Sequence, residues 1–514
     1  MSRAPQEASP SIVLGIAGAA RNAAIALCDG GRVVAVCEHE RVTRTRRAAL
    51  PDGQLPSETL ELVLRLAGRV RSDISAYAIA EEAVQLPSDL RVTRVDHHYA
   101  HAATSFYTSP FDEATVLICD RHSVPELTVW RGDDAGIRRE QFPWFGPAFA
   151  TVYSLAAEAL GFAVDGDEHK FEGLARIARR NVEAALPLIA YREDQLEIPS
   201  QFRDCIARLV APNGHRPPVT RAAQVANGVQ ESLAQLLLQV VGEIKNRIGG
   251  RNLCLGGGLF YNSYINTVLA ESGLYEKTFV PINPGNAGLA VGAALALADQ
   301  EAQPRCPGLL SPFLGPEYRT DEVKAILDNC KLSYDYVRDD HVIDRTTAAL
   351  AKGQLVGWFQ GRMEWGPRAL GNRSILASPV APYVLENLNV FLKQREPYRS
   401  YNVSVCAEDA PRYFRGPATS HFMEYEYEVI DPDIVRALLP LDATRLRVQT
   451  VPESAGQFYR LLRSFGDLTG VPILVNTSFN GFNEPIVCTP RDAVRVFHGT
   501  GLDMAVIGSF VLHK

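Results

Sequence analysis

A group of cationic side chains in the second half of the chain could bind an anion. Six of them fall within about forty residues, interleaved with glycine and proline: Arg362, Arg368, Arg373, Lys393, Arg395 and Arg399. Arginine is suited to this chemistry because its planar fork matches phosphate or carboxylate oxygens in pairs. A solvated basic face that pairs with Glu364 and Glu396 is the alternative interpretation.

A polar segment elsewhere in the same half favours the anion site. Asn476, Thr477, Ser478 and Asn480 directly follow the apolar run Pro472 to Val475, which we expect to be a strand. Their amides and hydroxyls can bind a sugar, an acyl oxygen or a phosphate. The second half is therefore expected to hold a polar, phosphate-binding site.

Two histidines in the first half are candidate metal ligands. His97 and His101 are four residues apart, so on a helix both imidazoles lie on one face. Asp120 follows the apolar run Thr115 to Cys119 and could supply a carboxylate as a third ligand. The alternative is a polar helix that carries ordinary histidines.

The elements that position these residues alternate between strand and helix. Apolar runs predict strands at 12–16, 23–28 and 33–37, with Asp29-Gly30-Gly31 as a hairpin turn. Ser57 is expected to cap a helix, and the strand at 253–255 leads through three glycines into a helix from about Asn262. Further strands are expected at 355–359 and 402–406. The fold class is therefore α/β, in which ligands bind at strand ends.

The chain length and a segment rich in proline and glycine indicate two domains. At 514 residues the chain exceeds the size of one core, and prolines and glycines between 303 and 316 interrupt the pattern. We place the domains at 1–305 and 306–514. The small-residue segment 281–294 is expected to form a turn and a helix that packs closely on a sheet. No internal repeat is visible in the sequence.

The composition and net charge of the chain argue against several classes of function. The net charge of −7 and pI near 5.9 argue against a nucleic-acid or membrane partner, and no apolar run is long enough for a membrane span. The nine cysteines form no CxxC pair and the N-terminus has no apolar leader, so we expect reduced thiols and a cytoplasmic protein.

Five ordered motifs resemble the NodU, CmcH and TobZ family of O-carbamoyltransferases. They cover nearly the whole chain and are the segments 96–101, 253–258, 356–376, 393–399 and 475–480. The resemblance implies an N-terminal actin-like (ASKHA-type) domain and a C-terminal YrdC-like α/β domain. It also implies that the C-terminal domain makes carbamoyl adenylate from carbamoyl phosphate and ATP, and that the N-terminal domain transfers the carbamoyl group to an acceptor hydroxyl.

The resemblance assigns roles to residues of this chain. Arg368, Lys393 and Arg399 match the catalytic phosphate-binding positions. Substrate-binding roles are expected for Arg362, Arg373, Arg447, Asn476, Thr477, Ser478 and Asn480. Gly256, Gly257 and Asn262 are expected near the nucleoside. A divalent metal, Fe²⁺ or Mg²⁺, is expected on His97, His101, Asp120 and Asn286.

The departures from the family pattern lie in the first half. Arg21-Asn22 stands where the family has His-Asp, and arginine cannot act as a base because it stays protonated. The segment that begins at Asp120 lacks the family's two glycines. Asn286 replaces the metal-binding aspartate and brings no charge. Arg46 stands where the family has a lysine.

Three hypotheses follow from these departures. The chain could be a working carbamoyltransferase of natural-product biosynthesis, such as antibiotic biosynthesis, in which His122, His39 or the substrate supplies the base. It could be a partner subunit of an intact paralogue. It could also make carbamoyl adenylate for an amine acceptor. By family analogy we expect a homodimer, and the sequence does not identify the acceptor.

Overall fold

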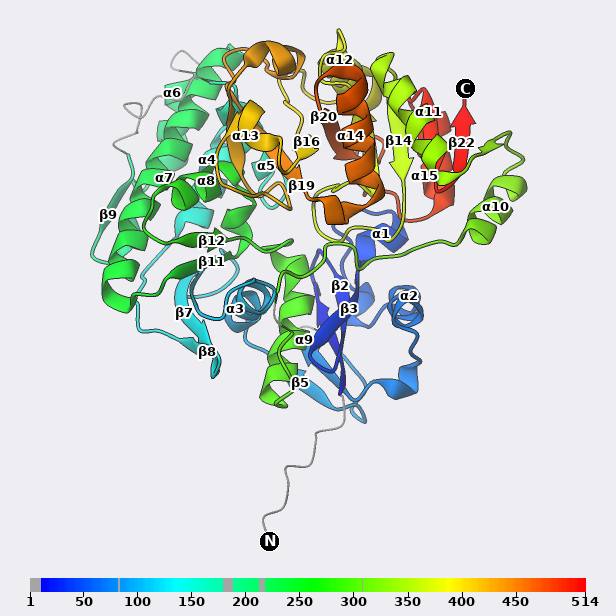
Figure 1. Cartoon of the computed structure of the whole chain (residues 1–514). Coiled ribbons are helices and arrows are strands. Elements are labelled where there is room, and N and C mark those ends of the chain that lie inside the picture. The colour runs from blue at the N-terminus through cyan, green and yellow to red at the C-terminus, as the bar shows by residue number, and fades with distance from the viewer. Residues whose placement is uncertain (1–10, 82–83, 179–187, 212–217, 307) are drawn as a thin grey trace.

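The computed structural model describes residues 11–81, 84–178, 188–211, 218–306 and 308–514 (Figure 1). The chain is a mixed α/β protein. Its first half contains two five-stranded sheets and a hairpin of β9 (Ala190–Arg192) and β10 (Gln195–Glu197), and its second half contains one ten-stranded sheet. Among the described residues, no sheet combines strands from both halves.

The first sheet has the strand order β3-β2-β1-β4-β5. Its strands are β1 (Ile12–Ala17), β2 (Ala24–Asp29), β3 (Arg32–Glu38), β4 (Ala76–Ile79) and β5 (Val92–Arg94). The first three are antiparallel, whereas β4 and β5 run parallel to β1. The predicted strands and the glycine turn between β2 and β3 are confirmed.

The second sheet repeats the topology of the first. It has the order β12-β11-β6-β7-β8, with an antiparallel β6-β7-β8 meander and with β11 and β12 parallel to β6. Its strands are β6 (Ala114–Cys119), β7 (Leu127–Asp133), β8 (Gly136–Arg139), β11 (Asn252–Gly256) and β12 (Lys277–Phe279). The sequence shows no internal repeat because the two sheets share a pattern of burial and connection rather than residue identities.

Helices α3 (His97–Tyr107) and α9 (Leu289–Gln300) lie between these two sheets (Figure 1). A Cβ at Gly292 would lie 1.9 Å from the Ala100 carbonyl oxygen of α3, and a Cβ at Gly15 would lie 1.9 Å from the Ala290 oxygen of α9. The close packing expected for the small-residue helix is therefore confirmed, and glycine is required at both contacts.

The other helices of the first half flank the sheets. They are α1 (His39–Thr43), α2 (Ser57–Ala67), α4 (Phe149–Ala159), α5 (Glu168–Arg176), α6 (Phe202–Val210), α7 (Val219–Ile248) and α8 (Ser263–Glu271). The prediction that Ser57 caps a helix is wrong in detail, because Pro56 is the N-cap residue and Ser57 begins the helix. Within the described ranges no helix is long and apolar enough to cross a membrane.

The ten-stranded sheet has the order β13-β22-β21-β14-β15-β20-β16-β19-β18-β17. Its strands are β13 (Asp335–Tyr336), β14 (Val356–Phe359), β15 (Arg373–Ala377), β16 (Val403–Cys406), β17 (Phe414–Arg415), β18 (Glu426–Val429), β19 (Arg445–Val451), β20 (Ile473–Ser478), β21 (Met504–Ile507) and β22 (Phe510–His513). The main helices are α10 (Thr320–Asn329), α11 (Asp339–Ala351), α14 (Gln457–Thr469) and α15 (Pro490–Gly499), with short helices α12 (Val384–Glu386) and α13 (Ala410–Tyr413).

The proline-rich segment between the halves forms backbone hydrogen bonds with both of them. The backbone N–H of Trp365 donates to the Pro312 oxygen at 2.8 Å, and that of Val36 in β3 donates to the Leu314 oxygen at 3.1 Å. Residues 312–316 therefore form a fixed connection between the halves, and a boundary near residue 305 remains our proposal.

The α3–α9 contact can be tested with two helical glycines. Gly292→Ala should lower the free energy of unfolding by about 3 kcal/mol, because its methyl group meets the Ala100 carbonyl. Gly242→Ala in α7 is the matched control, since a Cβ there meets no atom within 4 Å, and it should stabilise by about 0.5–1 kcal/mol. Thermal melts measure both changes, and equal melting temperatures for the two variants would contradict the packing described.

Candidate active site

One cavity of about 890 Å³ is lined by residues from both halves of the chain. Asp120, Tyr261 and Asn286 line it from the first half, and Arg368 and Lys393 line it from the second. Twelve lysine and arginine side chains line it against eight aspartates and glutamates, although the whole chain carries a charge of −7. The cavity is therefore a cationic region of an acidic protein and suits a polyanionic ligand.

Arg368 and Arg399 line the cavity with little neutralisation by carboxylates. Arg368 has no hydrogen bond or ion pair to any residue of the described ranges, and the nearest carboxylate oxygen of Arg399 is that of Glu396 at 3.7 Å. Burial and the neighbouring Arg447 lower the pKa of Arg368 to about 9, and burial and Arg395 lower that of Arg399 to about 10. A bound anion would relieve this repulsion, so both positions fit the predicted phosphate-binding role.

The loop that carries Arg368 is held from two directions. Glu364 Oε1 accepts the N–H groups of Leu370 and Arg373 at 2.7 and 3.1 Å. Glu38 of the first half accepts the N–H of Gly366 at 2.8 Å. The position of Arg368 is therefore set by buried carboxylates of both halves.

Lys393 binds the loop that follows β20. Its Nζ donates to the carbonyl oxygens of Ser478 and Asn480 at 2.6 and 3.0 Å. Burial, reinforced by Arg395, lowers the pKa of Lys393 well below its usual range. Ser478 Oγ donates to Asn480 Oδ1 at 2.8 Å, and Thr477 lines the cavity beside them. The predicted lysine and polar segment thus form one surface.

Asn476 leaves one acceptor unused. Its Nδ2 donates to Ser404 Oγ at 3.0 Å and to Gln449 Oε1 at 3.1 Å. Its Oδ1 is buried and has no hydrogen-bond partner among the described residues, although the residue lines the cavity. Such an orphaned acceptor is suited to a ligand donor group.

Arg362 and Arg373 lie outside the cavity, so their positions do not support the predicted binding role. Arg373 is fully buried and donates to the oxygens of Gln360 and Pro316 at 2.6 and 2.9 Å. Arg362 donates to the oxygens of Leu314 and Val34 at 2.8 and 3.0 Å. The NH1 and NH2 groups of Arg373 and the Nε and NH2 groups of Arg362 donate to backbone carbonyls, among them those of Leu314, Gly315 and Pro316 in the connecting segment.

A buried ion network joins the halves at the cavity wall. Arg447 of β19 donates through Nε to Ser263 Oγ at 2.7 Å and pairs with Glu172 of α5. Arg176 of α5 pairs with both Glu172, at 3.1 Å, and Glu426 of β18, at 2.5 Å. Burial raises the pKa of Glu172, but Arg447 and Arg176 outweigh this effect and hold it at about 2. Arg447, predicted to bind substrate, is thus already engaged by the first half.

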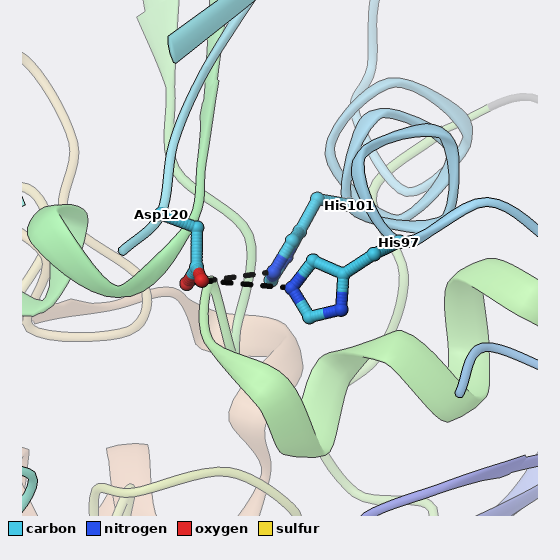
Figure 2. Close-up of side chains that lie close together, drawn as sticks. All are labelled: His97, His101 and Asp120. Atoms are coloured by element: carbon cyan, nitrogen blue, oxygen red, sulfur yellow. Dashed lines mark ion pairs between the residues drawn. The ribbon is translucent and has the colours of Figure 1, made fainter. Parts of the chain in front are cut away.

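The metal-ligand prediction agrees with the geometry. His97 and His101 point from α3 toward Asp120 at the end of β6 (Figure 2). The His97 Nε2 to Asp120 Oδ1 distance is 3.5 Å, and the His101 Nε2 to Asp120 Oδ2 distance is 3.7 Å. Both Nε2 atoms are buried without a hydrogen-bond partner among the described residues. Two orphaned imidazole nitrogens that face one carboxylate fit a divalent cation, and nitrogen ligands favour Fe²⁺ over Mg²⁺.

The protonation states suit metal binding. Burial lowers the pKa of His101 to about 3, which leaves its ring neutral. Burial raises the pKa of Asp120, but the neighbouring imidazoles of His97 and His101 outweigh this effect and bring it well below its usual range. Asp120 also accepts the Gly258 N–H at 3.1 Å, and Asn286 lines the same cavity.

The predicted nucleoside residues are only partly exposed to the cavity. Gly258 and Asn262 line it, whereas Gly256 and Gly257 are not among its lining residues. A Cβ at Gly257 would lie 2.2 Å from the Cys119 oxygen, so this glycine permits close approach to β6. Asn262 caps α8 and donates to Gln230 Oε1 at 2.9 Å.

The residues that depart from the family pattern form a cluster beside Asp120. Arg21 pairs with Asp165 at 2.5 Å, and its NH2 group lies 2.6 Å from His122 Nε2. Arg121 pairs with the same aspartate at 2.8 Å. Arg46 reaches Asn483 of the second half at 3.1 Å.

Sequence reasoning missed the contribution of α5. His169, Glu172 and Arg176 all line the cavity, and the last two form the ion network. Glu172 and Arg176 are four residues apart, which is typical of an ion pair on a helix, and this spacing could have drawn attention to the segment.

Comparison with known proteins assigns the chain to a family. The family model for the carbamoyltransferase N-terminus matches residues 85–295, and that for the carbamoyltransferase C-terminus matches residues 347–514. The nodulation protein NolO of Bradyrhizobium diazoefficiens is 34% identical over 82% of this chain and 79% of its own length. The nodulation protein NolNO of Sinorhizobium fredii is 29% identical over 96% of this chain and 78% of its own length. The chain therefore belongs to the carbamoyltransferase family.

Solved structures are more distant. An activator of the 2-hydroxyisocaproyl-CoA dehydratase from Clostridium difficile with bound ADPNP is 16% identical, covers 58% of this chain and 100% of its own, and gives a TM-score of 0.37.

The metal site makes a direct prediction. The protein loaded with Fe²⁺ should lose it about a hundredfold more readily after His101→Ala or Asp120→Asn, because each removes a ligand. Asn286→Asp should tighten binding about tenfold, since it adds a negative charge. Metal analysis after dialysis gives the readout, and His341→Gln at an exposed histidine is the control. Retention of Fe²⁺ by Asp120→Asn would contradict the assignment.

The ion network predicts a pH dependence. The folded-state pKa of Glu172 is depressed, so its contribution to stability is full above a pH of about 4.5 and is lost as the pH falls toward 2. Glu172→Gln should cost about 3 kcal/mol at pH 7 and progressively less in acid. Denaturant melts of the two proteins between pH 3 and pH 7 measure the difference. A difference that does not shrink in acid would exclude Glu172 as its cause.

Proposed function

We propose that this carbamoyltransferase forms carbamoyl adenylate in its second half and transfers the carbamoyl group to a small-molecule acceptor at the metal site of its first half. The observation that carries the proposal is one cationic cavity lined by Asp120 of the candidate metal site and by Arg368, Lys393 and Arg399 of the second half. His97 and His101 lie against Asp120 but are not among the lining residues. We assign the first half to the actin-like fold on its duplicated sheets, and a YrdC-like second half remains part of the proposal.

The first step brings two polyanions together. Atom balance requires that water release phosphate from carbamoyl phosphate, after which the carbamate oxygen attacks the α-phosphorus of ATP and pyrophosphate leaves. Arg368 and Arg399 would stabilise the charge that develops on the phosphates, because they lack strong counterions in the free protein. Lys393 would hold the 478–480 loop against the same groups.

The second step takes place beside Asp120. The acceptor oxygen attacks the carbamoyl carbon, the bond from this carbon to the phosphate oxygen breaks, and AMP leaves with the electron pair. A divalent cation on His97, His101 and Asp120 would supply Lewis-acid polarisation. Because both steps share one cavity, the adenylate need not pass through bulk water.

A pair of arginines tests the first step. With ATP and carbamoyl phosphate, Arg368→Ala should lower pyrophosphate release about a hundredfold or more without changing the melting temperature, because its guanidinium has no protein partner to lose. Arg373→Ala is the matched variant and should lower the melting temperature, since it removes four hydrogen bonds to backbone carbonyls and leaves those of Gln360 and Gly361 without this donor. No pyrophosphate release from the unaltered protein would refute the proposed function.

A further inference from the structure

The transfer step needs a base that Arg21 cannot supply. A hydroxyl group becomes an effective nucleophile only as its proton is removed, and Arg21, which lines the cavity, stays protonated and cannot take that proton. The inference below rests on the proposed function and asks which residue of this chain takes that proton.

Two histidines of the described ranges line the cavity, His122 and His169. His39 is hydrogen-bonded to Thr59 at 2.8 Å and is not a lining residue. His122 lies in the cavity, but its Nε2 is 2.6 Å from Arg21 NH2, which can only donate. The lone pair of His122 at Nε2 is therefore occupied by a permanent cation.

His169 has no such competitor. Its ring makes no hydrogen bond or ion pair with any residue of the described ranges, and it lies in the first turn of α5. The charged groups around it are Arg46 from the first half, Arg368 and Arg399 from the second half, and Lys170 on α5. Burial and these cations lower the pKa of His169 well below its usual range, so the ring is neutral and keeps a free lone pair.

The course of the chain places His169 between the two half-sites. Asp165 binds Arg21 and Arg121 at the corner of the cavity that Asp120 occupies. Four residues later, His169 is among the arginines that we assign to the adenylate-forming step. His169 therefore lines the cavity that also contains Asp120 and these arginines, where it can reach an adenylate bound by them.

We infer that His169 is the general base that deprotonates the acceptor hydroxyl. The imidazole takes the hydroxyl proton while the acceptor oxygen bonds to the carbamoyl carbon and AMP departs. The imidazolium then releases the proton to solvent. Bound phosphate groups neutralise Arg368 and Arg399, so the ring becomes a stronger base when the adenylate is present than in the free protein.

The test compares two nucleophiles that differ in their need for a base. The full chain loaded with Fe²⁺ receives ATP and carbamoyl phosphate, with either glycerol or hydroxylamine as the acceptor probe, and AMP formation is measured. Glycerol needs general-base help, whereas the hydroxylamine nitrogen attacks without it. His169→Gln should lower the ratio of the glycerol rate to the hydroxylamine rate about a hundredfold.

The pH profile gives a second readout. The glycerol rate of the unaltered protein should fall in acid as the base becomes protonated, and this acidic limb should be absent in His169→Gln. The exposed His341→Gln is the matched control, and His122→Gln tests the competing cavity histidine.

The outcomes separate the two proposals. Absent pyrophosphate release from the unaltered protein overturns the proposed function itself. Pyrophosphate release with an unchanged glycerol-to-hydroxylamine ratio in His169→Gln overturns only the role of His169. A ratio that falls in His122→Gln instead assigns the proton to that residue and likewise overturns the inference.

Discussion

The buried ion network between α5 and the ten-stranded sheet determines whether the cavity exists as one space. Glu172 and Arg176 from the first half meet Glu426 and Arg447 from the second, and each of the four side chains is at most 7% exposed. Removing one charge would leave its partner buried and unpaired, which is more costly than the pair is stabilising. The two halves therefore meet in one arrangement, and the cavity walls come from both.

The cavity is lined by more cationic than anionic side chains, which favours the binding of anions. Burial lowers the pKa values of Arg368 and Arg399, and repulsion from Arg447 and Arg395, respectively, lowers them further. In the free protein these cations therefore repel one another at the position where phosphates would bind, and anionic substrates would remove this repulsion. The binding of ATP and carbamoyl phosphate is thus favoured by relief of repulsion as well as by new hydrogen bonds.

The sequence predicted local features well. The spacing of His97 and His101, and the position of Asp120 after a strand, sufficed to bring these three together, because helix periodicity and strand direction are local rules. Lys393 and the 476–480 segment were likewise recognised and do line the cavity. Strands β1, β2 and β3 of the first sheet and the hairpin turn between β2 and β3 were predicted for the same reason, whereas β4 and β5 were not predicted.

Contacts between residues that are far apart in the chain could not be predicted from the sequence. Charge alone could not distinguish Arg368, which faces the cavity, from Arg373, whose donors are used by backbone carbonyls distant in sequence. The roles of Glu172 and His169 depend on residues more than two hundred positions away. The duplicated sheets were missed because a shared topology needs only shared burial, not shared residues.

The central claim is that the adenylate formed in the second half is consumed within the same cavity. The direct test is rapid ultrafiltration of the full chain during steady turnover with adenine-labelled ATP, carbamoyl phosphate and glycerol as the acceptor probe. The account predicts that labelled carbamoyl adenylate stays with the protein, at no more than about one per chain, while AMP appears in the filtrate. Accumulation of carbamoyl adenylate in the filtrate ahead of AMP would contradict it.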